Sequence, residues 1–90
     1  MAHDPKRSAA ALHYTHGEGA PTLVAKGEGF IAEKILATAQ QHGVPIHHDP
    51  ALVGALSRLD LGEQIPTELF GAVATVIAFI YRLKTQQESR

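Results

Sequence analysis

The stretch that most constrains this chain is an uncharged, largely apolar run from Leu69 to Tyr81. Its 13 residues fall short of the roughly 20 that a bilayer-spanning helix needs. No secretory signal or membrane insertion is therefore expected, because the polar N-terminus is not followed by an apolar segment either. Apolar residues cover well over half of a helix drawn through the run. The pattern predicts a third helix, ending near Lys84, that is central to a core or shared with a second chain, and leaves the oligomeric state open.

The composition limits what such a helix can pack against. A chain of 90 residues forms one domain, and 44% apolar residues are enough for a small core. The absence of cysteine excludes disulfides, thiolate zinc sites and a cysteine nucleophile. Eight Lys and Arg against nine Asp and Glu argue against nucleic acid as a partner, since backbone phosphates are neutralised by clustered cations.

The hydrophobic period changes at Gly27. Before it, residues 9–16 and 22–26 read as two short strands, and the glycine- and proline-containing loop between them predicts a hairpin. After it, Ile31, Ile35 and Ala39 repeat at i, i+4 and i+8, which predicts an amphipathic helix. Gly43 has the position of a glycine that ends this helix in the left-handed conformation.

The second half of the chain begins with a short strand expected at residues 44–47. Asp49 and Pro50 then read as the N-cap and first residue of a second helix that runs to about Leu59. The order β-β-α-β-α-α is that of a small α/β or α+β domain. We place this domain at residues 9–85, between flexible segments at 1–8 and 86–90.

Site chemistry is sparse. His47, His48 and Asp49 are of the residue types that bind zinc or nickel, but adjacent histidines diverge and the spacing supplies no third ligand. The pair Gly27 and Gly29 lacks the remaining residues of a nucleotide-binding loop. No nucleophile motif is present. These patterns favour an interaction domain over an enzyme and predict no cofactor.

Several segments, in their order and spacing, resemble the cytoplasmic C-terminal domain of the flagellar and type III secretion export-switch family (FlhB/YscU), the flagellar branch more than the virulence branch. The most specific are the sequence V-A-K-G, which ends at Gly27, and the later sequence G-x-x-I-P, which begins at Gly62. The segments are residues 11–14, 20–27, 43–46, 50–56 and 61–74. The resemblance implies an α/β domain in which a small mixed sheet of three to four strands packs with three to four helices. It also implies a role in choosing which substrates the export machine accepts.

The resemblance carries one departure. Members of the family cut their own backbone within an Asn-Pro-Thr-His motif by cyclisation of the asparagine. Asp4, Pro5, Lys6 and Arg7 occupy the matching positions, so only the proline is retained. Because a carboxylate does not cyclise efficiently in this way, we expect no efficient self-cleavage. Full-length members also carry an N-terminal membrane domain, and this chain resembles a free-standing copy of the cytoplasmic part.

In this family a small apolar surface near the start of the second strand and on the last helix receives substrate signals. The matching residues are Ala20, Pro21, Ala74 and Ile77. The alternative is that Ala74 and Ile77 only fill the core.

The leading hypothesis is a regulatory or adaptor domain that docks on the flagellar export gate or on export substrates, in the cytoplasm at the periphery of the membrane-bound apparatus. Two alternatives remain: a small metal- or ligand-binding protein that uses its histidines, and a relic of the fold without a role in export.

Overall fold

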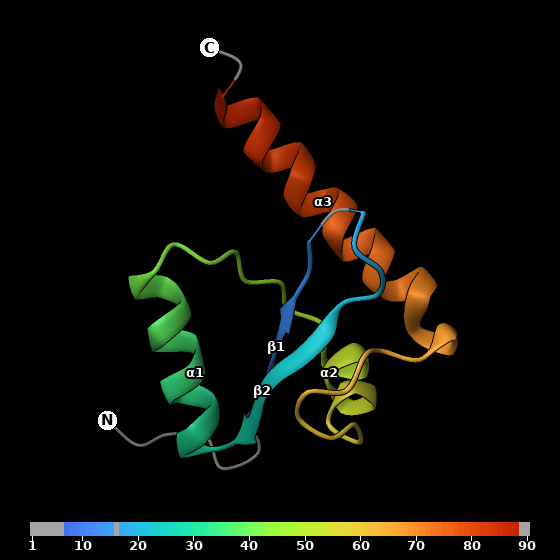
Figure 1. Cartoon of the computed structure of the whole chain (residues 1–90). Helices are drawn as coiled ribbons and strands as arrows, with labels where there is room; N and C mark the ends of the chain where they lie inside the picture. Colours follow the sequence, from blue (N-terminus) through green and yellow to red (C-terminus); the bar gives the residue numbers. More distant parts are fainter. Residues whose placement is uncertain (1–6, 16, 89–90) are drawn as a thin grey trace.

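In a computed structural model the chain folds into a β-hairpin with helices on both sides (Figure 1). The structure describes residues 7–15 and 17–88, with side chains as far as Arg82. The elements are β1 (Ser8–His13), β2 (Thr22–Glu28), α1 (Phe30–Gln41), α2 (Pro50–Leu56), the 3-10 turn η1 (Thr67–Leu69) and α3 (Phe70–Glu88). Helix α1 lies along one side of the hairpin, while α2 and the first half of α3 lie on the other side. The expected hairpin and three helices are confirmed.

The sheet is smaller than expected. Strands β1 and β2 pair antiparallel, from Ser8 opposite Glu28 to His13 opposite Thr22, with a bulge between Ala11 and Leu12. In the described residues the sheet has two strands, so the expected mixed sheet of three to four strands is wrong. A single bridge between Thr22 and Gln64 extends the outer edge of β2.

The strand expected at residues 44–47 is absent, and its backbone explains why. The Val44 amide donates to the Ala39 carbonyl at 2.9 Å, where it completes the end of α1. Pro45 has no amide to donate to a neighbouring strand. Gly43 has φ 69°, as expected of a glycine that ends a helix. Residues 44–49 therefore form a connector without regular structure.

Helix α2 begins as the sequence predicts. The Asp49 carboxylate accepts a hydrogen bond from the Leu52 amide at 3.1 Å, and Pro50 follows at the first helical position. The helix ends at Leu56, short of the expected Leu59. At that end, the Lys26 ammonium donates to the Ser57 and Leu59 carbonyls, which satisfies acceptors that the helix leaves unpaired. Strand β2 thus holds the C-terminal end of α2.

The core lies between β2, α2 and α3. Its buried members are Leu23, Leu52, Leu56, Ile65 and Val73. On the other side of the hairpin, Ala9 of β1 and Ala32 of α1 are buried.

Of the two expected roles for α3, a helix central to the core or one shared with a second chain, the first holds only in part. Val73 is its single fully buried side chain among the residues whose side chains are described, whereas Phe70, Phe79 and Tyr81 are 44%, 47% and 45% exposed. The two-stranded sheet and the short α2 are too small to surround a helix of 19 residues, so α3 packs through one side and projects beyond the hairpin.

Candidate docking surface

The hairpin loop places Ala20 and Pro21 in different environments. Gly17 and Gly19 adopt φ of 84° and 92°, conformations that glycine reaches without strain, and they turn the chain back toward β2. Pro21 is buried, and its carbonyl accepts a hydrogen bond from the Ile65 amide at 3.0 Å. Ala20 is half-buried and packs against the core cluster. Ala20 therefore presents the accessible side chain of this pair, while Pro21 anchors the loop.

Helix α3 supplies the second half of the surface. Ala74 is exposed, and Ile77 is half-buried against the same core cluster that Ala20 contacts. Residues separated by three or four positions lie on one side of a helix, so Phe70 precedes Ala74 and Tyr81 follows Ile77 along one stripe. In the view of Figure 1 the hairpin loop and α3 overlap, and Ala20 packs against the core cluster to which Val73 of α3 belongs. Ala20 and Ile77 thus border the same core cluster, and Ala74 lies on the exposed stripe of the helix that carries Ile77.

This arrangement bears on whether Ala74 and Ile77 only fill the core. Ile77 contributes to the core with part of its surface, but Ala74 does not. The stripe also includes Phe70, which lies in the apolar run from Leu69 to Tyr81 but was not among the residues predicted for the partner-binding surface. Its spacing of four residues from Ala74 is the signal that could have identified it. We name the surface formed by Ala20, Phe70, Ala74 and Ile77 the docking surface.

The three residues His47, His48 and Asp49 lie in different surroundings and do not face one another. The Asp49 carboxylate caps α2, and the His47 ring lies edge-on to Phe79 of α3 with 6.1 Å between the ring centroids. His48 instead lines a pocket beside α1. In the described part of the chain, no group of three or more His, Cys, Asp or Glu side chains could hold a metal ion.

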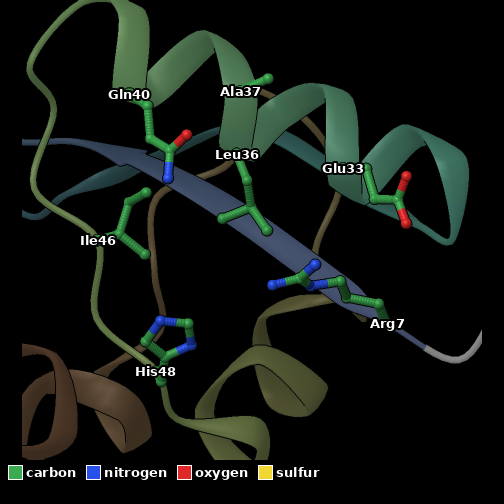
Figure 2. A pocket seen from close by; sticks show the side chains of 7 residues that line it. All are labelled: Arg7, Glu33, Leu36, Ala37, Gln40, Ile46 and His48. Carbon is green, nitrogen blue, oxygen red and sulfur yellow. The ribbon is translucent and has the colours of Figure 1, made fainter. Parts of the chain in front are cut away.

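The pocket at His48 is an open cavity of about 290 Å³. Figure 2 shows Leu36 and Gln40 of α1 above it, Ile46 and His48 of the connector at one end, and Arg7 and Glu33 at the other. Side chains of both charge signs line it, with no Ser, Thr or Cys among them. Its lining from α1 and from Ile46 and His48 of the connector places it on the α1 side of the hairpin.

The degenerate cleavage motif is only partly visible. Asp4, Pro5 and Lys6 lie outside the described residues. Arg7 is exposed, and its carbonyl accepts a hydrogen bond from the Gly29 amide at 2.6 Å. This bond fixes the chain that enters β1 against the start of α1.

Comparison with known proteins gives this geometry a context. The family model described as the FlhB HrpN YscU SpaS family matches residues 2–80. The chain belongs to this family. The resemblance found in the sequence is thereby confirmed. In the described residues, no helix is both long and apolar enough to cross a membrane.

Two relatives differ in how much of their length the chain covers. The flagellar biosynthetic protein FlhB of Salmonella typhimurium is 41% identical over 83 residues, which are 90% of this chain and 22% of that protein. The chain therefore spans about a fifth of that FlhB. The uncharacterized protein YlqH of Bacillus subtilis is 41% identical over 80 residues, which are 88% of this chain and 86% of that protein.

Solved structures of the FlhB and YscU type share the fold. The cytoplasmic domain of FlhB from Shewanella putrefaciens has a TM-score of 0.85 at 34% identity and covers 92% of this chain and 69% of that chain. The C-terminal domain of PscU has a TM-score of 0.79 at 27% identity, over 84% of this chain and 99% of that chain. The α/β architecture is therefore that of the family's cytoplasmic domains.

Proposed function

We propose that this chain is a regulatory or adaptor domain of the flagellar type III export apparatus. It acts in the cytoplasm, at the periphery of the membrane-bound machinery, and docks on export-gate components or export substrates without enzymatic activity or a cofactor. The support is family membership together with similarity to FlhB over nearly the whole chain. The family membership suggests the type of partner, and we assign the binding of that partner to the docking surface.

The proposal includes the absence of self-cleavage. Cyclisation of an asparagine requires the side-chain amide, and position 4 has a carboxylate instead. Cleavage by this cyclisation needs the side-chain amide nitrogen to attack the main-chain carbonyl carbon of the same residue, and a carboxylate has no such nitrogen. The domain therefore acts with its residue 4–5 peptide bond intact.

The exposed flank of α3 beside the hairpin loop is the observation that carries the docking role. Phe70 is 44% exposed, and it lies in the uncharged run from Leu69 to Tyr81. Covering such side chains gains about 25 cal/mol for each Å² of apolar surface removed from water. The loop residue Ala20 is small, so an apolar side chain of a partner can approach the backbone closely.

The test is complementation in a flagellated bacterium whose export-switch protein lacks its own cytoplasmic domain. We expect this chain to restore part of motility and secretion, and Ala74→Asp to abolish the rescue by placing a charge on the exposed stripe. Ala72→Asp is the matched control, because residue 72 is exposed on the same helix about 160° away at about 100° per residue.

Both variants are first compared with the wild type by thermal unfolding, since neither position is buried and neither change should lower the melting temperature appreciably. Absence of rescue by the wild-type chain contradicts the export role. Equal rescue by Ala74→Asp and Ala72→Asp contradicts the docking surface.

A further inference from the structure

The two segments that build the docking surface carry charge of one sign. Residues 14–25 and 59–81 contain four carboxylates and no Lys or Arg. All eight Lys and Arg lie elsewhere in the chain with the other five carboxylates. At neutral pH, with neutral histidines, these segments have a net charge of −4 and the rest of the chain +3. The near-neutral total therefore conceals an uneven distribution of charge along the chain.

The backbone arranges three of the carboxylates close to the hairpin side of the surface. Glu18 belongs to the hairpin loop, two residues before Ala20. The Glu63 carbonyl accepts a hydrogen bond from the Leu23 amide at 2.9 Å, so the segment that begins at Asp60 runs beside the start of β2. The Asp60 amide in turn donates to a Glu63 carboxylate oxygen at 2.9 Å.

The fourth carboxylate, Glu68, lies in η1 immediately before Phe70 and α3. All four side chains are exposed, and none forms an ion pair within the described residues. The cations nearest in sequence lie at the borders. Arg58 precedes the acidic segment, and Arg82 follows the stripe. The Lys26 ammonium is directed to the carbonyls at the end of α2.

We propose that the segment that docks here carries Lys or Arg next to its apolar side chains. The inference depends on the proposed docking function and specifies the chemistry of the partner. Burial of the apolar stripe supplies the affinity, while charges at the rim set the association rate and exclude unsuitable partners. An acidic segment with the same apolar residues meets like charge around the surface and is rejected.

The experiment pans a random-peptide phage library on the immobilised chain and measures binding of the enriched peptides, made synthetically, by fluorescence anisotropy. We expect enriched sequences in which Lys or Arg flank apolar residues. Their affinity should fall at least tenfold between ~0.01 M and ~1 M salt, because the screening length shortens from about 30 Å to about 3 Å.

Two charge-reversal variants separate the acidic rim from the overall charge. Glu18→Lys with Glu68→Lys reverses two rim charges, and Glu28→Lys with Glu33→Lys makes the same change in net charge on the α1 side. We expect about a tenfold loss of affinity for the first pair of substitutions and less than a twofold loss for the second, at low salt. Glu63 is not substituted, because its side chain holds the turn at Asp60.

The outcomes distinguish this inference from the docking function. Neutral or acidic enriched peptides that lose binding in Ala74→Asp overturn the basic partner and leave the docking surface intact. Equal losses in the two charge-reversal variants also overturn it. Enriched peptides that bind Ala74→Asp as well as they bind the wild type overturn the docking surface and this inference together.

Discussion

Gly27→Ala tests the contact by which β2 and α1 approach each other. A methyl group at this position would overlap the Ile31 Cγ2 atom and lie 2.7 Å from the Ile31 Cβ. Real carbon atoms do not approach this closely without a shift. Because the Ile31 Cβ is bonded directly to the backbone of α1, no side-chain rotation removes the overlap. The helix must move away from the sheet, or the strand must bend.

The magnitude follows from two opposing effects. Overpacking of a close contact costs about 1–3 kcal/mol. Replacement of glycine also restricts the unfolded chain, which stabilises the fold by about 0.4–1 kcal/mol. The overlap is the larger effect, so we expect a net loss of about 1–2 kcal/mol in the free energy of unfolding. At about 4–8 °C per kcal/mol for a domain of this size, the melting temperature should fall by roughly 5–15 °C.

The assay is urea unfolding of a double-mutant cycle with Ile31→Ala. Ile31 is 51% exposed, so its truncation alone should cost little. It removes the Cγ2 atom while the Cβ remains, and the smaller side chain lets α1 adjust; the cost of Gly27→Ala should therefore fall by at least half in this background. Gly54→Ala is the matched control. It lies within α2 with no neighbour inside 4 Å of the added carbon, and we expect it to stabilise the protein by about 0.5–1 kcal/mol.

Two results would refute the reasoning. One is a Gly27→Ala protein as stable as the wild type. The other is a destabilisation that persists unchanged in the Ile31→Ala background, because the overlap with the Ile31 Cγ2 atom, the closer of the two contacts, would then contribute nothing.

Two further predictions concern the cap of α2 and the chain's N-terminal motif. Asp49→Ala removes the acceptor of the Leu52 amide and should lower the free energy of unfolding by about 1 kcal/mol. Asp49→Ser keeps an acceptor and should retain most of that stability. Equal losses for the two variants in urea unfolding would contradict the cap. The wild-type chain should keep its intact mass during prolonged incubation at neutral pH, and a variant with the restored motif (Asp4→Asn, Lys6→Thr, Arg7→His) should be cut after residue 4. A wild-type fragment that begins at Pro5, seen by mass spectrometry, would contradict the absence of self-cleavage.

Features with a local physical cause could be predicted from the sequence. The hairpin follows from its glycine-rich loop, and the end of α1 from Gly43. The start of α2 follows from an aspartate and a proline, which together satisfy and pre-order a first helical turn. In each case the residues that specify the structure are neighbours in the chain.

Features that depend on which groups a residue meets in the fold could not be predicted in this way. Val44 has a side chain suited to a strand, yet its amide is already bonded to Ala39 at the end of α1. The apolar residues of α3 indicate a buried helix, but burial depends on how much surface the rest of the fold can cover. The same limit applies to the docking surface. Phe70 was visible as an apolar residue, and its exposure was not.

The hydrogen bond from the Ile65 amide to the Pro21 carbonyl has a consequence for how tightly a partner can bind. It ties the hairpin loop to the segment that leads into α3, so the two halves of the docking surface are joined before any partner arrives. Pro21 adds to this because its ring fixes its own φ. A partner therefore meets a preorganised surface, and the entropy lost on association is mainly its own.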